Sequence, residues 1–354
     1  MVVYLFVALS PILLSLAFPS YCTDKKQKRC FYVALVFIFL LFVGCRSIYL
    51  GSEDTQQYVY SFSKARLSTS LTDYLASRTA TETGFNVFEW FLTHILRFDQ
   101  AIILVTSFLY IASVCVFADR NSKNPALTIT LYITIELFLF NIQGMRQSIA
   151  MSLCLLSYEF IKNRKLVPFL LLCFLALTFH RTAVVFFPMY FLYGLKVTRI
   201  RVLALLPIFI LVLLFSKYIV SVANDVFSSG GIDRQYSDST GNGGFFTLVI
   251  HLVIIVFSLF SMQKFGDKNN CLLFYTSLLS LLCFTMRYFG VREAERISFY
   301  FSYAQLALLP NSLASFDRKS RIGVGILVVC LATFIFISKL TNNNFLPYRF
   351  FWSD

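Results

Sequence analysis

The sequence predicts an all-α, polytopic membrane protein of about twelve transmembrane helices, forming a single integral membrane domain over residues 1–354. Hydrophobic residues make up 58% of the chain and the mean hydropathy is +0.71, whereas about half of a soluble domain is apolar. The apolar residues form long runs, such as 31–43, 166–177 and 202–215. Because apolar and polar residues do not alternate, helices and not barrel strands must satisfy the backbone in lipid.

Twelve segments have the length and apolar character of membrane helices, given that about 18 residues cross a hydrocarbon layer of roughly 30 Å. They are residues 2–20, 31–46, 101–118, 126–142, 144–161, 166–180, 182–195, 202–222, 246–263, 270–287, 297–314 and 322–339. The sixth and seventh segments are short, which gives a count of ten to twelve. The first segment has no basic stretch before it and no small-residue cleavage site after it, so we expect a retained helix.

Basic residues define the topology, because they occur in six clusters and two predicted helices separate each cluster from the next. The clusters are residues 25–29, 120–123, 162–165, 196–201, 264–268 and 318–321, and they hold 17 of the 31 Lys and Arg. Cytoplasmic loops carry an excess of Lys and Arg, so all six clusters are expected in the cytoplasm and both termini outside.

Two loops are then expected on the outer side, at residues 47–100 and 223–245. The first contains an apolar stretch, 85–96, that predicts an amphipathic helix lying in the membrane interface. The second is rich in Ser and Gly and is expected to be flexible.

No pattern indicates a metal ion or another cofactor. The nine Cys mostly lie inside apolar runs and form no C-x-x-C pair, and no D-x-D or H-E-x-x-H sequence occurs. The formal net charge of +13 follows the membrane topology, so a bilayer and not nucleic acid is the expected partner.

The basic residues on the outer side differ in type from those in the cytoplasmic clusters. Eleven of the 14 are Arg, whereas the cytoplasmic clusters contain ten Lys and seven Arg. Lys suffices to set topology, but Arg keeps its charge when desolvated and binds phosphate through two hydrogen bonds. For any single Arg, an ordinary ion pair with an outer acidic residue explains its presence equally well.

Several polar residues lie at helix ends that this topology brings to one outer surface. They are Arg46, Asp54, Tyr58, Arg146, Gln147, His180, Arg181, Arg287, Arg292, Glu295 and Arg296. Such a set suits a lipid-linked diphosphate, whose phosphates lie at headgroup depth while the tail stays in lipid. Arg side chains can neutralise a departing diphosphate without a metal, and a helix N-terminus adds a positive dipole beside Arg146.

Three polar residues each have two interpretations. His180 is either an interfacial polar cap or a functional group, and we favour the second. Glu136 lies inside an apolar run, where a carboxylate costs several kcal/mol unless it is paired, so a functional role and a structural hydrogen bond are equally good explanations. We interpret His251 as a hydrogen-bonded core residue rather than a cavity-lining one.

Four motifs occur in an order and spacing that resemble the EpsG-like family of bacterial polysaccharide polymerases. They are Arg46 with Asp54 and Tyr58, then ETGF at 82–85, then GMRQSIA at 144–150 followed by FHRT at 179–182, and finally Glu295 and Arg296 with Tyr300 and Pro310. The family often has Pro where Thr83 stands. The resemblance covers roughly residues 30–310.

The resemblance implies an O-antigen (Wzy) or exopolysaccharide polymerase of the bacterial inner membrane, similar in architecture to lipid-dependent glycosyltransferases. Such an enzyme transfers a growing glycan from undecaprenyl diphosphate onto the non-reducing end of a lipid-linked repeat unit at the periplasmic face. Its implied partners are undecaprenyl-diphosphate-linked oligosaccharides, a flippase and a chain-length co-polymerase.

Residue roles follow from this chemistry as a hypothesis. Arg146, Arg296 and one of Arg46, Arg287 or Arg292 bind the donor diphosphate, with Tyr58, Gln147 and Tyr300 among the substrate-binding residues. The base for the acceptor hydroxyl is Asp54, His180 or Glu295. Histidine titrates near neutrality without special tuning, which favours His180, whereas Glu295 next to Arg296 is expected to be ion-paired and to orient an Arg.

Three other functions fit parts of this pattern. An O-antigen ligase is expected to have a larger periplasmic domain than residues 223–245 provide. A transporter or flippase of lipid-linked sugar predicts ionisable groups along a central path, whereas the mid-span regions are nearly free of them. A sugar acyltransferase is the weakest alternative.

Overall fold

The computed structural model describes the chain at residues 1–78, 82–135, 137–218, 221, 243–261, 267–289, 291, 293–342 and 345–353. In these ranges the chain is all-α, as predicted, and the one strand-like pairing is an isolated antiparallel bridge between Arg46 and Phe350. Glu136, Arg292 and nearly all of the predicted loop 223–245 lie outside the described residues, so the expectations for them stay predictions.

The chain forms two compact units, and the first combines Met1–Tyr190 with Phe316–Asp354. Its helices are α1 (Val2–Ala17), α2 (Lys25–Phe39), the π-helix η1 (Leu40–Gly44), α3 (Glu53–Leu67), α4 (Leu71–Ala76), α5 (Thr83–Ile95), α6 (Ala101–Asn121), α7 (Pro125–Thr134), α8 (Leu137–Gln143), α9 (Met145–Lys162), α10 (Leu166–Phe179), the 3₁₀ helix η2 (Arg181–Phe186), α17 (Arg318–Asn342) and the 3₁₀ helix η5 (Phe351–Ser353).

The second unit is Phe191–Ser315. Its helices are α12 (Arg199–Leu214), α14 (Gly243–Ser261), α15 (Lys268–Met286), the 3₁₀ helix η4 (Arg287–Phe289) and α16 (Glu293–Leu313), and the short α11 (Met189–Leu192) lies at the boundary of the two units. Each of the twelve segments predicted to be helical therefore contains a helix.

Polar caps fix where several of these helices begin. The Asp24 carboxylate accepts a hydrogen bond from the Gln27 amide (2.7 Å) at the start of α2. Asn124 caps α7 in the same way, and Pro125 follows at the first helical position, where no backbone donor is needed.

Four helices in the described part of the chain are long and apolar enough to cross a membrane. They are Lys25–Gly44, Ala101–Asn121, Lys268–Phe289 and Arg318–Thr341. The pair Pro125–Thr134 and Leu137–Gln143, bent by 60°, counts as a fifth if it forms one broken span. These helices indicate a multi-pass membrane protein, and the number of twelve crossings stays a prediction.

The predicted outer loop 47–100 contains three helices. The sequence predicts one of them, because the stretch 85–96 corresponds to α5, but it predicts neither α3 nor α4. Both are polar helices whose apolar residues are too few to form a continuous run. Acidic residues in the first turn of α3, Glu53 and Asp54, and basic residues in its last turn match the helix dipole.

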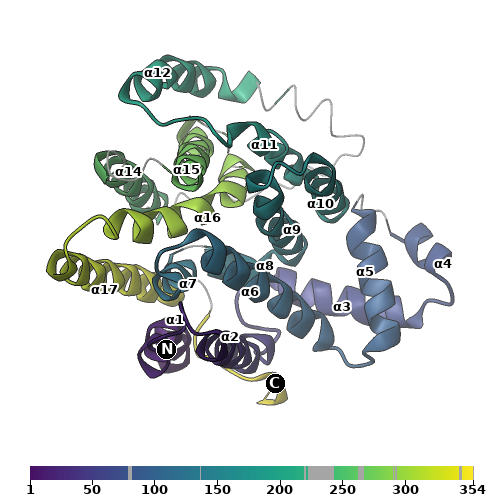
Figure 1. The fold of residues 1–354 in the computed structure, drawn as a ribbon. Helices are drawn as coiled ribbons and strands as arrows, with labels where there is room; N and C mark the ends of the chain where they lie inside the picture. The colour runs from purple at the N-terminus through teal and green to yellow at the C-terminus, as the bar shows by residue number, and fades with distance from the viewer. Residues whose placement is uncertain are drawn as a thin grey trace. The chain divides into compact units, whose positions relative to one another are not determined.

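An apolar cluster holds α3 and α5 against α6 and α9 in the first unit. Its buried residues are Val59, Phe62, Phe85, Leu92, Ala101, Ile102, Ile103, Met145 and Ile149. The elements α3, α4, α5 and α10 also contact one another in the sequence α3–α5, α4–α5 and α5–α10, and α10 packs along α9 (Figure 1). This packing brings the ends of α5, α9 and α10 together.

Candidate functional site

A close contact between α5 and α10 sets the position of the residue that precedes α5. A Cβ atom added to Gly84 would lie 2.2 Å from Oγ1 and 2.8 Å from the backbone carbonyl carbon of Thr178, the penultimate residue of α10. Real Cβ atoms do not approach backbone so closely, so only glycine permits this contact. The contact places Glu82, the N-cap residue of α5, beside His180, the C-cap residue of α10.

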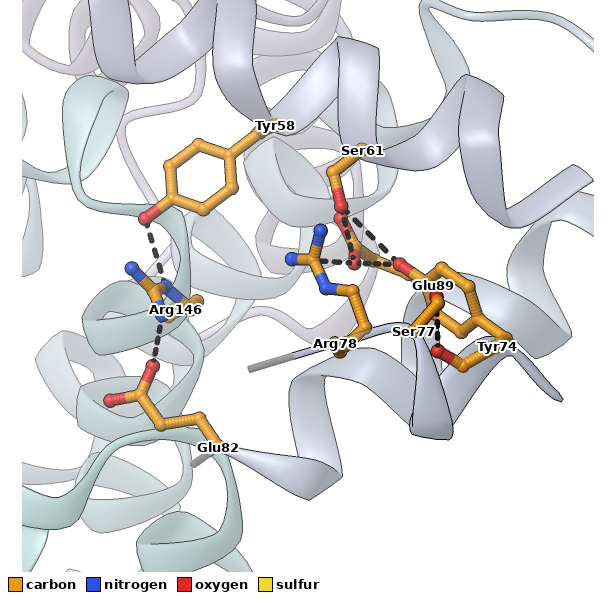
Figure 2. A network of polar contacts seen from close by, with 8 residues as sticks. All are labelled: Tyr58, Ser61, Tyr74, Ser77, Arg78, Glu82, Glu89 and Arg146. Carbon is orange, nitrogen blue, oxygen red and sulfur yellow. Dashed lines mark hydrogen bonds and ion pairs between the residues drawn. The ribbon is translucent and has the colours of Figure 1, made fainter. Parts of the chain in front are cut away.

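The Glu82 carboxylate bridges two of the predicted site residues. Its Oε1 accepts a short hydrogen bond from Nδ1 of His180, and its Oε2 forms an ion pair with Nη1 of Arg146 at 2.6 Å. Nε of Arg146 donates to the hydroxyl oxygen of Tyr58 at 3.3 Å (Figure 2). The Glu82 carboxylate at the start of α5 thus joins α9 to the α10–η2 junction, and Arg146 connects it to Tyr58 on α3.

The burial of these groups differs in a way that suits a binding site. Glu82 is buried, whereas the side chains of Arg146 and His180 are 27% and 21% exposed. Burial alone would raise the pKa of the Glu82 carboxyl, but the hydrogen bond and charge of His180 and the charge of Arg146 outweigh it and hold the pKa below its ordinary value. The carboxylate is thus ionised behind two partly exposed nitrogen donors.

Aromatic side chains form an apolar wall next to these polar groups. The Arg146 guanidinium carbon lies 5.7 Å from the centre of the Tyr58 ring, and this ring packs edge-on against Phe85 with centroids 5.5 Å apart. Phe88 in turn contacts Phe179, which precedes His180. These rings pack beside the polar groups, and Tyr58 lies directly against the Arg146 guanidinium.

A second polar network surrounds Glu89, one and a half turns into α5. Its Oε2 accepts hydrogen bonds from Ser61 Oγ at 3.0 Å and from the Tyr74 hydroxyl at 2.9 Å, and it lies 4.0 Å from Nη2 of Arg78 (Figure 2). Glu89 is 0% exposed. Burial raises its pKa to about 7, even though Tyr74, Arg78, Ser61 and the charge of Arg146 act in the opposite direction.

The other predicted residues of the first unit lie on the same elements. Asp54 is partly buried in the first turn of α3, one turn before Tyr58. Gln147 follows Arg146 on α9 and is buried. The predicted set Asp54, Tyr58, Arg146, Gln147 and His180 is thus carried by α3, α9 and the end of α10.

Arg46 lies in a different environment. It is 2% exposed, and its guanidinium donates to the carbonyl oxygens of Val43 (2.8 Å) and Ile142 (2.7 Å), which ties the end of η1 to the end of α8. Gln100 donates to the carbonyl oxygens of Gly44 and Arg46 at 2.8 Å each. In this conformation the guanidinium has almost no surface for a substrate phosphate, and its contacts join chain segments.

The second unit holds the late predicted residues. Nη1 of Arg287, at the end of α15, pairs with Oε2 of Glu295 on α16 at 2.6 Å. Glu295 is ion-paired, as expected, and the partner recorded for it is Arg287. Arg296 is partly buried on α16 and Tyr300 is buried one turn further.

Two groups of residues were not predicted as site residues from the sequence. Glu82 belongs to the ETGF segment. The feature of the sequence that could have indicated its role is Gly84, which permits the close contact with α10. Arg78 and Glu89 gave no signal, because a lone acidic residue on an amphipathic helix is usually solvated. Across the described ranges, no group of three or more His, Cys, Asp and Glu side chains is arranged to hold a metal ion.

Comparison with known proteins gives one match. No curated protein and no solved structure matches the sequence at a significant level. A family model described as the EpsG family matches residues 3–350, which is nearly the whole chain and includes every residue of the Glu82, Arg146 and His180 contact. The chain therefore belongs to the EpsG family.

Proposed function

We propose that this protein is a polysaccharide polymerase that transfers a glycan from undecaprenyl diphosphate onto the non-reducing end of a lipid-linked repeat unit. The reaction takes place at the periplasmic face of the bacterial inner membrane. Membership of the EpsG family supports a membrane protein of exopolysaccharide biosynthesis. The observation that carries the proposal is the convergence of Arg146 and His180 on Glu82.

Arg146 is the donor-side residue in this proposal. Its side chain is partly exposed, and its guanidinium forms an ion pair with Glu82 and a hydrogen bond to Tyr58. It also lies in the first turn of α9, where backbone N–H groups and the helix dipole favour an anion. A preorganised cation at this place stabilises the negative charge that develops on a departing diphosphate.

The acceptor sugar needs a base that removes the proton of its hydroxyl. Asp54, His180 and Glu295 were the candidates, and Glu295 is the poorest because its ion pair with Arg287 stabilises the ionised form. His180 has its Nδ1 next to a carboxylate, an arrangement that orients a general base in other enzymes. Attack by the hydroxyl in a single displacement inverts the anomeric configuration of the donor sugar.

The roles of the remaining residues stay predictions. Arg287, Arg292 and Arg296 are proposed as further diphosphate ligands, and Tyr300 as a substrate-binding residue. Arg46, which donates to two backbone carbonyls, is better suited to hold the fold than to bind the donor.

Replacing Arg146 tests the proposal in a strain that lacks the gene. We expect Arg146→Ala to reduce long polymer by a factor of about 100 or more, in line with the loss of a single transition-state donor. Arg146→Lys keeps the charge but cannot form bidentate hydrogen bonds, so an amount of long polymer between those of the wild type and Arg146→Ala is expected. The readout is the ladder of surface glycan on a gel, with the amount of protein in the membrane measured in parallel.

Arg66→Ala is the matched control, because Arg66 lies on α3 and also forms an ion pair, with Asp99 at 2.5 Å, outside the proposed site. It should produce wild-type polymer. Core carrying one repeat unit is the product expected when Arg146 is replaced. Wild-type polymer from Arg146→Ala would refute the assignment of Arg146. Lipid-linked polymer with bare core would indicate a ligase, and a complete lack of exported units would indicate a flippase.

A further inference from the structure

The contact between Glu82 and His180 joins two residues that are 98 positions apart in the sequence. Glu82 is not among the residues proposed above to bind the donor or to act as the base. It is buried, so a direct contact with a substrate is not expected. Its two oxygens face different partners, with Oε1 on the imidazole and Oε2 on the guanidinium of Arg146. What the carboxylate does to the imidazole follows from the protons available in this contact.

An ionised carboxylate can only accept hydrogen bonds, so the proton in this contact belongs to Nδ1 of His180. The hydrogen bond from His180 and the charge of Arg146 act against burial, and the pKa of the Glu82 carboxyl is held below its ordinary value. A neutral imidazole that carries its hydrogen on Nδ1 has its lone pair on Nε2, the opposite ring nitrogen. The His180 side chain is 21% exposed, so part of it is accessible from outside the protein.

We propose that Glu82 is a positioning residue for the transfer, fixing His180 in the tautomer that presents Nε2 as the proton acceptor. The inference rests on the proposed polymerase function and deepens it, because it selects His180 over Asp54 as the base. The same carboxylate aligns Arg146, so one group positions both the base and the cation for the leaving diphosphate.

The transfer step is then complete in its atoms and charges. The acceptor hydroxyl gives its proton to Nε2 of His180 while its oxygen forms a bond to the anomeric carbon of the donor. The bond from that carbon to the diphosphate oxygen breaks, and its electron pair stays on the diphosphate, which faces Arg146. The imidazolium, stabilised by Glu82, afterwards releases its proton to water or to the departing diphosphate.

The charged groups around His180 come from every element packed against it. Glu82 precedes α5, Arg146 begins α9, and Arg181 follows His180 in η2. Tyr58 on α3 contacts Arg146 from the opposite side. Glu82 contacts both the imidazole and Arg146, so its replacement alters both contacts, and the nitrogen signals of His180 report the effect on the tautomer separately.

The tautomer can be measured directly by NMR of the detergent-solubilised protein labelled at histidine nitrogens. The chain has three His, and His180→Gln and His94→Gln variants assign the signals. We expect wild-type His180 to be protonated at Nδ1 when neutral, and Glu82→Gln to lose this preference. A neutral His180 protonated at Nε2 in the wild type would overturn the proposal without reference to activity.

Kinetics with purified lipid-linked repeat units test the consequence. Glu82→Gln should lower kcat by at least 100-fold and change KM less than threefold, since a positioning residue acts in the transition state. Glu82→Asp keeps a carboxylate, so its kcat should lie between those of the wild type and Glu82→Gln. Glu159→Gln is the matched control, because Glu159 also forms ion pairs, with Arg120 and Lys162, away from the site.

The effects of paired variants separate this proposal from the proposed function. The further loss of kcat that Glu82→Gln causes in a His180→Ala background should be much smaller than its loss in the wild type, and what remains reflects the alignment of Arg146. The role of Glu82 is overturned if the wild type polymerises and the Glu82→Gln variant has an unchanged kcat, whether or not its KM is raised. A wild type that polymerises no lipid-linked repeat unit overturns the proposed function instead. Melting temperatures in detergent show whether each variant is folded.

Discussion

At the scale of single residues, Glu89 combines complete burial with an ionisable group. Ser61 and Tyr74 both donate to the same oxygen, Oε2, and Arg78 lies 4.0 Å from it. These contacts only partly offset the loss of hydration, so the pKa is about 7 in place of the ordinary 4.5. The residue thus changes its charge close to neutral pH.

The stability of the protein should depend on pH through this group. A raised folded pKa means that the folded state binds the proton more tightly, so the contribution of Glu89 is full below pH 4.5 and is lost as the pH rises to about 7. At about 1.4 kcal/mol per unit, the difference is on the order of 3 kcal/mol. Glu89→Gln should therefore gain stability relative to wild type between pH 5 and pH 8, measured by melting in detergent.

The matched control is Glu159→Gln, whose side chain is ion-paired and partly exposed. It should show no comparable gain in melting temperature over wild type between these pH values. An equal melting-temperature difference between Glu89→Gln and wild type at pH 5 and pH 8 would contradict the raised pKa.

Residue type and position in the predicted topology together indicated part of the candidate site. Arg146 and His180 were selected because they lie at helix ends on the outer side, and the structure places them on a common carboxylate. Arg46 satisfied the same criterion, yet it is buried against two carbonyls. The difference depends on which backbone groups surround each guanidinium, and that information arises only when distant helices pack.

At the scale of helices, the approach of α5 to α10 decides the geometry of the site. We expect Gly84→Ala to push the start of α5 away from Thr178, because the new methyl group would overlap side-chain and backbone atoms of that residue. Overpacking of this kind costs about 1–3 kcal/mol. The same movement separates Glu82 from His180, so polymer formation should fall by about tenfold or more.

Gly325→Ala is the control, since a Cβ at Gly325 on α17 has no neighbour within 4 Å. It should match the wild type in melting temperature and in polymer length. If Gly84→Ala behaves like Gly325→Ala in both measurements, then the close contact is not required for the site.

Helices could be predicted from the sequence wherever apolar runs are long. The predicted segment 101–118 corresponds to α6, Ala101–Asn121, and 144–161 corresponds to α9, Met145–Lys162. The polar helices α3 and α4 contain no such run, so the sequence did not predict them. Both pack against α5, and both donate hydrogen bonds to Glu89. Tertiary contacts therefore stabilise the helices that carry Tyr58 and Tyr74.

At the scale of the whole molecule, charge type sorts the two sides of the predicted topology. The prediction of twelve crossings puts the Lys-rich clusters inside and the Arg-rich helix ends outside. Four to five helices in the described ranges have the length and composition of spans. The remaining crossings depend on shorter segments such as Leu166–Phe179, and a direct measurement of sidedness is the appropriate test.

Single cysteines in a variant without the nine native ones can report each side. Ala76→Cys lies on exposed α4 in the predicted outer loop, and Lys123→Cys and Lys319→Cys lie in two predicted cytoplasmic clusters. A membrane-impermeant maleimide should label position 76 in intact spheroplasts and label positions 123 and 319 only after lysis. Labelling of position 123 or 319 in intact spheroplasts would contradict the predicted topology.

The C-terminal segment sets an order in which the first unit can be completed. The hydroxyl of Tyr348 donates to the carbonyl of Phe42, 306 residues earlier, and Ser47 N–H and Phe351 N–H bond across the chain on either side of Arg46. These contacts form only after residues 345–353 have left the ribosome. The backbone on either side of Arg46 therefore gains these partners only after all the intervening helices have been synthesised, which makes this part of the fold a late step in biogenesis.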